Sequence, residues 1–234
     1  MRAVALIDGE HYPDVVREAL ATLPYDFAAA VLVGGSEKLR GGESYGVPLA
    51  ATIEEAVGAH VPDVVVDLSD EPVLGPRERL RLVGRTLALG LPYVGADFRF
   101  EPPRFEPLQI PSLAVIGTGK RVGKTAVTGR VARALAPGRR IVVVAMGRGG
   151  PARPETVAVP PTVETLLELS RSGRHAASDH LELAALAGVP TIGCRRCGGG
   201  LAGAVAVSNV LAGVEAAAAQ EPNMLPFDCN SAAL

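Results

Sequence analysis

The sequence predicts an α/β protein with two parallel-sheet domains: a Rossmann-like domain at the N-terminus, then a P-loop NTPase-like domain that is incomplete at its C-terminal end. Three observations lead to this prediction. Short apolar runs alternate with helical patterns in both halves of the 234-residue chain. A proline-rich segment separates the halves, and a glycine-rich loop follows the first strand of the second half. Strands that alternate with helices pair in parallel through right-handed crossovers.

The composition indicates a folded protein and excludes several functions. Hydrophobic residues make up 48% of the chain and charged residues 21%, which permits a core and excludes intrinsic disorder. Aromatic residues reach only 4% and the formal net charge is −2, so we expect no nucleic acid partner. No apolar run approaches the roughly 18 residues of a membrane span, and the N-terminus lacks a signal-peptide pattern. We therefore expect a cytoplasmic protein with no membrane partner.

Residues 1–96 are predicted to form the Rossmann-like domain. Apolar β-branched runs predict its strands, and helical periodicity between them predicts its helices. The first helix has proline in its first turn, and Thr52 with Glu55 three residues later forms a capping box at the start of the second. The expected strands are Ala3–Ile7, Phe27–Val33, Val64–Leu68 and Pro92–Val94, and the expected helices are Pro13–Thr22, Ile53–Ala59 and Pro76–Leu89.

Residues 97–111 are predicted to be a linker, and residues 112–234 a second domain. The four prolines of the linker cannot continue a helix or a central strand. The second domain repeats the alternation, with Thr162 as the N-cap of one helix. The expected order is strand Ser112–Ile116, a helix to Ala136, strand Ile141–Met146, a helix from Thr162 to Ser170, helix Asp179–Ala187, strand Pro190–Gly193, a long Ala-rich helix, and an apolar segment Met224–Phe227.

The strongest motif is the glycine-rich loop between the first strand and the first helix of the second domain. Its backbone N–H groups would surround the phosphates of ATP, Lys124 would contact the phosphate oxygens, and the Thr125 hydroxyl would ligate Mg²⁺. Lys120 lies near the position expected for the γ-phosphate. The alternative is a glycine-rich turn without a ligand. The predicted nucleotide-binding residues are Gly117, Thr118, Gly119, Lys120, Arg121, Val122, Gly123, Lys124 and Thr125.

A second candidate loop, Met146-Gly147-Arg148-Gly149-Gly150-Pro151, directly follows the second strand of this domain. In an open α/β sheet, ligands bind beyond the carboxyl ends of the strands, so the loop should flank the nucleotide. Its glycines would let the backbone approach a phosphate, and Arg148 would supply a bidentate guanidinium group. The alternative is a solvated turn with a surface arginine.

A third candidate loop, Cys194-Arg195-Arg196-Cys197-Gly198-Gly199-Gly200, also follows a predicted strand. Its two cysteines raise the alternatives of zinc and redox chemistry, but there is no second cysteine pair, and His175 and His180 fit no zinc spacing. Two arginines before three glycines favour a cradle for a highly charged anion. A basic surface loop is the remaining alternative.

The segment Asp8-Gly9-Glu10-His11 follows the first strand of the N-terminal domain, again at a carboxyl end. In a cleft between the domains, His11 would contact substrate or act as an acid or base. The alternative is a histidine that caps a turn.

These segments resemble the cyclic 2,3-diphosphoglycerate synthetase family. The resemblance is carried by the three loops above, by Ala176-Ala177-Ser178-Asp179, and by Leu6-Ile7-Asp8-Gly9-Glu10-His11-Tyr12-Pro13, so it spans most of the chain. The phosphate loop is also similar to that of dethiobiotin synthetase, because Thr118 stands where the strict pattern has its first glycine. Enzymes of that kind use ATP to activate an acid for ring closure.

The resemblance implies ATP-dependent, Mg²⁺-requiring closure of a phosphoanhydride within 2,3-diphosphoglycerate, with release of ADP and phosphate. The implied catalytic residues are Lys120, Lys124 and Arg148. The implied substrate-binding residues are Arg148, Arg195, Arg196 and His11. The alternatives are another ATP-dependent kinase or ligase of small acids, and a non-catalytic nucleotide-binding module.

The chain departs from the family near its end. Family members are longer and have a Glu-Gly-Ser-Gly-Ala-Ala segment where this chain reads Asp228-Cys229-Asn230-Ser231-Ala232-Ala233. Asp228 is a candidate Mg²⁺ ligand through water, together with Thr125, although Pro226 is expected to interrupt the strand before it. We expect either a C-terminally short relative or one that works with a complementing C-terminal half or as a homo-oligomer.

Overall fold

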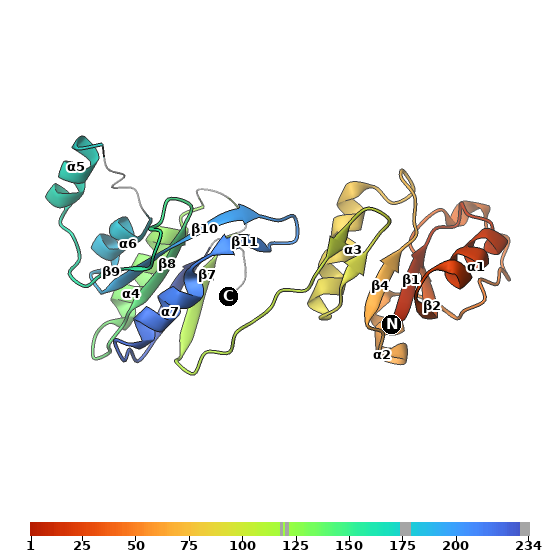
Figure 1. Ribbon diagram of the computed structural model, residues 1–234, viewed down its shortest axis with the longest axis horizontal. Coiled ribbons are helices and arrows are strands. Elements are labelled where there is room, and N and C mark those ends of the chain that lie inside the picture. The colour runs from red at the N-terminus through yellow and green to blue at the C-terminus, as the bar shows by residue number, and fades with distance from the viewer. Residues whose placement is uncertain (118, 120–121, 174–178, 230–234) are drawn as a thin grey trace. The chain divides into compact units, whose positions relative to one another are not determined.

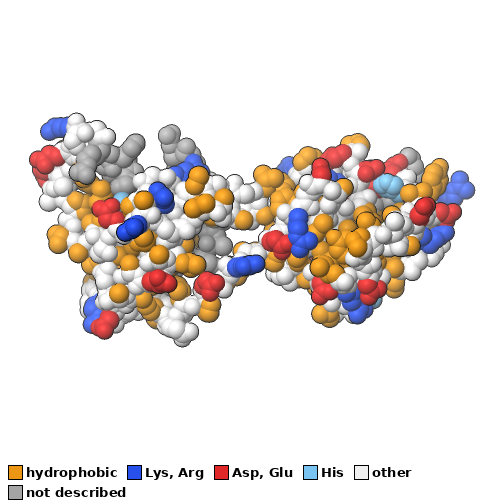
Figure 2. Space-filling view, in the orientation of Figure 1, with side chains coloured by type: hydrophobic (Ala, Val, Ile, Leu, Met, Phe, Trp, Pro, Cys, Tyr) orange, Lys and Arg blue, Asp and Glu red, His pale blue; other side chains and the backbone are white. Residues whose placement is uncertain are grey.

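The computed structural model describes residues 1–117, 119, 122–173 and 179–229. The chain divides into two compact units, Met1–Pro103 and Arg104–Leu234, and each is described by itself. Each unit contains a mostly parallel sheet with packed helices (Figure 1), which confirms the predicted α/β class. On the face drawn in Figure 2, acidic and basic side chains are interspersed over both units, in keeping with the net charge of −2.

Unit 1 is built on one sheet with the strand order β3-β2-β1-β4-β5-β6. All neighbours are parallel except β5 and β6, and the central strands β1 and β4 are apolar and almost wholly buried. The short strand β6 lies inside the segment that the sequence predicts to be a linker. The elements are β1 Arg2–Ile7, α1 Pro13–Thr22, β2 Asp26–Leu32, β3 Leu49–Ala50, α2 Ile53–His60, β4 Val64–Asp67, α3 Pro76–Ala88, β5 Tyr93–Val94 and β6 Arg99–Phe100.

The helices of unit 1 begin where the local sequence signals predict. Proline occupies the first turn of α1, and the Thr52 side chain accepts a hydrogen bond from the backbone N–H of Glu55 at 3.2 Å. The Glu55 carboxylate accepts from the N–H of Ala51 rather than from that of Thr52. The capping box therefore closes one residue before its predicted position, and it still satisfies two N–H groups at the helix start.

Unit 2 is built on a second sheet with the strand order β11-β10-β8-β12-β7, and β9 pairs with β10 beside this path. The strands β7, β12, β8 and β10 are parallel, whereas β9 and β11 run antiparallel to β10. The elements are β7 Ser112–Ile116, α4 Lys124–Leu135, β8 Val143–Gly147, β9 Glu155–Val157, α5 Val163–Arg171, α6 Asp179–Ala187, β10 Thr191–Gly199, β11 Val205–Ser208, α7 Val210–Ala218 and β12 Leu225–Cys229.

The segment after Gly193 differs from the expected short strand and long helix. β10 continues to Gly199 and forms an antiparallel hairpin with β11, and α7 begins only at Val210. The chain turns back after Gly199, where the N–H of Gly203 donates to the carbonyl of Gly200 and Gly203 has a φ of +88°, which a side chain would disfavour. Pairing with β10 thus outweighs the helix propensity of the alanines before Val210.

The expected interruption of the last strand by Pro226 is wrong. β12 is fully buried between β7 and β8, with Pro226 opposite Leu113 of β7. On the β8 side, Ile141 pairs with Met224, and regular pairing resumes at Phe227 opposite Val144. Because proline has no N–H to donate, it fits the gap between these two paired positions.

Helices cover both faces of the second sheet. Alternate residues of β8 point to opposite sides: Val144 packs in a cluster with α7, and Val143 in a cluster with α4 and α6. The α7 layer lies very close, because a Cβ on Gly213 would come within 2.1 Å of the Cys194 sulfur. At the end of the sheet, β7 is paired with β12 alone among the described strands, and it exposes Leu113 and Ile116.

We expect Gly213→Ala to destabilise the protein by about 2 kcal/mol or more, because the new methyl group overlaps the Cys194 sulfur in a packed core. Gly84→Ala is the matched control: it lies inside α3 with no atom near the added Cβ, and it should gain up to about 1 kcal/mol. Chemical denaturation of both variants measures the difference. Equal stability of the two variants would contradict the close packing of α7 on β10.

Candidate active site

The carboxyl ends of four parallel strands lie side by side at one end of the second sheet. The phosphate loop follows β7, Asp228 lies near the end of β12, Arg148 follows β8, and Arg196 lies on β10. The register places Asp228 opposite both Val115 and Ala145, so these ends are level with one another. Open α/β sheets bind ligands at the carboxyl ends of their strands.

The described part of the phosphate loop turns sharply into α4. Gly123 has a φ of +85° and directly precedes Lys124, the first residue of the helix. A Cβ on Gly117 would lie 2.7 Å from Cδ of Lys124, so the lysine side chain crosses back over the start of the loop. The positive φ of Gly123 favours glycine there, and at position 117 a side chain would have to displace those of Lys124 and Val122. Thr118, Lys120 and Arg121 of the predicted site lie outside the described residues.

The first helical turn is tied to the neighbouring strand by one side-chain hydrogen bond. Thr125 Oγ1 donates to Oδ2 of Asp228 at 2.8 Å, and Asp228 is only 5% exposed. A hydroxyl and a carboxylate are hard oxygen donors of the type that Mg²⁺ prefers. Among the described residues no group of three or more His, Cys, Asp and Glu could hold a metal by itself. Thr125 and Asp228 therefore fit a magnesium ion whose other ligands come from water or a bound molecule.

A cavity of about 400 Å³ lies beyond β8 and β10. It is lined by Arg148, Arg196, Cys197 and the glycine-rich turn of the β10–β11 hairpin. Arg196 is 9% exposed, and its Nε atom has no hydrogen-bond partner among the described residues. A buried guanidinium group with an unused donor in a glycine-lined cavity is suited to bind an anion.

The two predicted substrate-binding arginines of β10, Arg195 and Arg196, lie on opposite faces of the sheet. Successive residues of a strand point to opposite faces, so Arg196 is buried at the cavity while Arg195 is exposed and does not line it. The same alternation places Cys194 and Cys197 on opposite faces, which contradicts a shared zinc site. The three cysteines are free, and Cys194 and Cys229 are buried. Burial raises the pKa of the Cys194 thiol to about 11, and that of Cys229 to about 12.

Asn209 holds the Arg148 loop against β10, a role that the sequence analysis missed. Its Oδ1 accepts from the N–H of Arg195 at 2.7 Å, and its Nδ2 donates to the carbonyl of Pro151 at 3.1 Å. At the adjacent residue of the loop, a Cβ on Gly150 would lie 2.0 Å from the Cys194 carbonyl oxygen. Arg148 thus extends from a loop that is fixed on β10 at two points.

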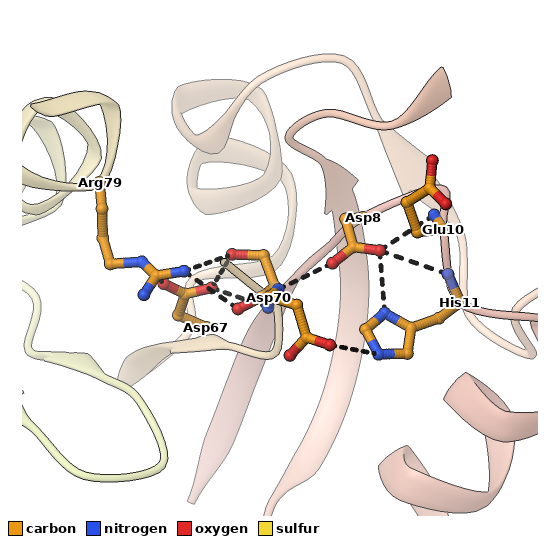
Figure 3. A network of polar contacts seen from close by, with 7 residues as sticks. Asp8, Glu10, His11, Asp67, Asp70 and Arg79 are labelled. Atoms are coloured by element: carbon orange, nitrogen blue, oxygen red, sulfur yellow. Dashed lines mark hydrogen bonds and ion pairs between the residues drawn. The ribbon is translucent and has the colours of Figure 1, made fainter. Parts of the chain in front are cut away.

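A separate polar network lies in unit 1, at the carboxyl ends of β1 and β4 (Figure 3). The buried Asp8 accepts from the N–H groups of Glu10 and Asp70 and contacts Nδ1 of His11 at 2.8 Å. Nε2 of His11 lies 3.4 Å from the Asp70 carboxylate. Burial acts to raise the pKa of Asp8, but these hydrogen bonds together hold the pKa below its usual value. His11 thus joins two loops, and its role toward substrate stays a prediction.

Asp67 organises the other half of this network. It accepts hydrogen bonds from Tyr93 Oη at 2.7 Å and from the N–H of Ser69 at 2.9 Å, and its Oδ2 lies 3.0 Å from Nε of Arg79. Arg79 also lies over the ring of Phe98. A cavity of about 560 Å³ borders the network and α1. The sequence analysis included Asp67 only as part of the expected strand Val64–Leu68, and it missed Arg79, which comes from α3, the next helix along the chain.

Two family models match the chain. The N-terminal domain of cyclic 2,3-diphosphoglycerate synthetase matches residues 2–101, and the P-loop domain of the same enzyme matches residues 112–234. The synthetase of Rubrobacter xylanophilus is 49% identical over 249 aligned positions, covering 100% of this chain and 56% of the relative. That of Pyrococcus abyssi is 46% identical, covering 98% and 56%. The chain spans about half the length of the curated relatives it matches. Among its described helices, none is both long and apolar enough to cross a bilayer.

Asp8→Asn should lower the free energy of unfolding at neutral pH by roughly 1.5–3 kcal/mol, because the charged acceptor of several buried hydrogen bonds is lost. The pKa of Asp8 is depressed in the folded state, so its stabilisation is present above the unfolded value near 3.8 and disappears as pH falls through the folded value. The variant should therefore lose less stability on acidification than the parent.

Urea denaturation at neutral and acidic pH measures this difference. Asp14→Asn is the control, because Asp14 is an exposed carboxylate on α1 whose pairing with Arg17 contributes little. A parent and an Asp8→Asn variant with the same acid dependence would refute the role of Asp8.

Proposed function

The chain belongs to the cyclic 2,3-diphosphoglycerate synthetase family, and we propose that it carries out or takes part in the ATP-dependent closure of a phosphoanhydride within 2,3-diphosphoglycerate. The products are cyclic 2,3-diphosphoglycerate, ADP and phosphate. One observation carries the proposal: the phosphate loop and the Arg148–Arg196 cavity both lie at the carboxyl ends of the parallel strands.

ATP would bind at the phosphate loop. The loop turns into α4 at Gly123, so the first N–H groups of the helix are directed at the phosphates, and Lys124 supplies a positive charge to them. Lys120 and Arg121 stay predicted contacts of the same phosphates. A magnesium ion held by Thr125 and, directly or through water, by Asp228 would neutralise charge on the transferring phosphoryl group.

The phosphorylated acid would bind beyond β8 and β10. Arg148 and Arg196 supply two guanidinium groups, and the glycine-rich turn beside them leaves room for a phosphate against the backbone. β7 and β10 are separated by three strand spacings, which is about 14 Å. A triphosphate that extends from one end and a bisphosphate from the other would meet between them.

The reaction needs two transfers at phosphorus. An oxygen of one substrate phosphate attacks the γ-phosphorus, and the bond from that phosphorus to ADP breaks. The second substrate phosphate then attacks the phosphorus of the first, inorganic phosphate leaves, and the ring closes. Both steps bring anions together, so the contribution of the arginines and Lys124 is positioning and charge neutralisation. The Asp228 carboxylate accepts a hydrogen bond from the Thr125 hydroxyl and thereby orients it.

Other parts of the site remain proposals of the same kind. His11 would contact substrate from unit 1, and Arg195 would add long-range positive charge from the exposed face of β10. We expect the reaction in the cytoplasm, where ATP is available. The proposed partners are the small phosphorylated acid and a second copy of the chain.

The first test is ADP release by the purified chain with ATP, Mg²⁺ and 2,3-diphosphoglycerate. We expect release that requires this acid, and a Lys124→Ala variant that binds ATP at least about 100-fold more weakly, because its phosphate contact is lost. Arg130→Ala removes an exposed charge from the same helix and is the control. Release of ADP with other acids but not with 2,3-diphosphoglycerate would overturn the proposed substrate.

The two neighbouring arginines of β10 provide a second test. Arg196→Ala should weaken the binding of 2,3-diphosphoglycerate by about 10- to 100-fold, because it removes a buried charged donor, and ATP binding should be unchanged. Arg195→Ala should change the same affinity by less than about threefold, because Arg195 is exposed on the opposite face. Equilibrium titration measures both affinities without turnover. Equal effects of the two variants would exclude this cavity as the substrate site.

A further inference from the structure

The outer edge of β10, on the side away from β8, is covered by two short strands with a gap between them. β9 pairs with residues 191–193, and β11 pairs with β10 from Arg196 onward. Continued pairing of β9 would bring Pro154 opposite Cys194, and proline has no N–H to donate to the neighbouring strand. The backbone groups of β10 at the gap therefore need other partners, above all those of Arg195.

Asn209 fills this gap. Its Oδ1 accepts from the N–H of Arg195 at 2.7 Å, and its own N–H donates to the Arg195 carbonyl at 3.3 Å. Its Nδ2 donates to the carbonyls of Pro151 at 3.1 Å and of Ala152 at 3.3 Å, both in the loop that carries Arg148. Because an N–H donates and a carbonyl accepts, only this orientation of the amide satisfies all its partners.

Asn209 is the N-cap residue of α7, where asparagine ordinarily accepts a hydrogen bond from an N–H in the first turn of its own helix. The Asn209 side chain makes no such bond. Instead, the hydroxyl of Ser208 accepts from the N–H of Val210. The Asn209 amide therefore stabilises the contact between the Arg148 loop and β10, and not the start of α7.

We propose that Asn209 is a positioning residue for the phosphorylated acid: it fixes Arg148 relative to Arg196 and so sets the affinity for the acid without contacting it. Arg148 precedes Pro151 in the loop, and Arg196 directly follows Arg195 on β10. One side chain thus ties together the backbone segments that carry the two guanidinium groups of the cavity. The proposal rests on the proposed function for the identity of the anion.

The physical reason is the order of the loop before the anion binds. Gly149 and Gly150 separate Arg148 from Pro151, and glycine gives the backbone its greatest conformational freedom. A free loop would have to be ordered each time an anion binds, and this cost would be subtracted from the contribution of Arg148 to the affinity. With Asn209 in place, the loop is already ordered when the protein has folded.

Two variants remove the clamp in different ways. Asn209→Asp retains the acceptor for Arg195 but loses both donors, and its carboxylate faces two carbonyl oxygens, so the loop should be released. Asn209→Ala loses all three side-chain hydrogen bonds and adds no charge. The matched control is Asn223→Asp, because Asn223 Oδ1 also accepts from a backbone N–H, that of Arg140 at 2.8 Å, but lies before β12 at the other end of the sheet.

The test is a double-mutant cycle measured by equilibrium titration with 2,3-diphosphoglycerate. In the parent chain, Arg148→Ala should weaken binding at least about tenfold. In either Asn209 variant the same substitution should weaken binding by less than about threefold, because Arg148 is no longer held at the cavity. Arg196→Ala should weaken binding by the same factor in every background, and Asn223→Asp should leave the effect of Arg148→Ala unchanged.

A general loss of stability would not produce this selective coupling. An effect of Arg148→Ala that is equal in the parent and in the Asn209 variants would overturn the proposal. A coupling of Asn209 to Arg196 as large as that to Arg148 would overturn it as well, because it would indicate loss of the whole cavity.

Trypsin digestion tests the clamp without any ligand. Arg148 is exposed and followed by Gly149, so the bond between them is a substrate once the loop is free, whereas Pro154 protects the bond after Arg153. We expect cleavage after Arg148 to be at least about tenfold faster in both Asn209 variants and unchanged in Asn223→Asp. Unchanged cleavage in the Asn209 variants would overturn the proposal.

The failure of this proposal and that of the proposed function are distinguishable. If ADP release does not depend on 2,3-diphosphoglycerate, the cycle is measured with inorganic phosphate. Coupling of Asn209 to Arg148 and faster cleavage would then retain the positioning role and reject the proposed function. Release of ADP as proposed, with an effect of Arg148→Ala that does not depend on Asn209, would reject the positioning role alone.

Discussion

Chain polarity is the constraint on which unit 2 depends. Because the neighbouring strands β7, β12, β8 and β10 are parallel, the loops that follow all four must lie at the same end of the sheet. Residues more than 100 positions apart meet there, as the hydrogen bond between Thr125 and Asp228 shows. The cavity beside Arg148 lies at this same end of the sheet. A sheet of mixed direction would send some of these side chains to the opposite end.

Close backbone approach is the second condition, and glycine meets it. Gly150 presses the Arg148 loop onto the carbonyl of Cys194, and Gly213 lets α7 approach the sulfur of the same residue from its other side. Cys194 is therefore held by one contact to a functional loop and one to a core helix. Its small, buried and protonated thiol fits this space, so its importance is in packing and not in chemistry.

Local signals in the sequence predicted much of this, whereas contacts that depend on tertiary pairing were missed for a physical reason. Thr52 and the phosphate loop were recognised because a cap or a strand–glycine–helix pattern is complete within a few residues. The β10–β11 hairpin, the Asn209 clamp and the ion pair of Arg79 with Asp67 depend on partners that a linear pattern does not specify. The expectation for Pro226 was wrong because the missing N–H of a proline disrupts a sheet only where a neighbouring strand would accept a hydrogen bond from it.

The apolar strand β7 has a consequence of another kind. Its sequence is as hydrophobic as that of a strand covered on both faces, yet Leu113 and Ile116 are exposed, and within the described chain its outer edge offers unpaired amide groups to solvent. An edge of this character is a template for strand addition. A further strand could extend the sheet there without breaking any existing hydrogen bond, and it would lie directly beside the strand that leads into the phosphate loop. Strand addition by a second chain would therefore place that chain beside the five residues that lead into the phosphate loop.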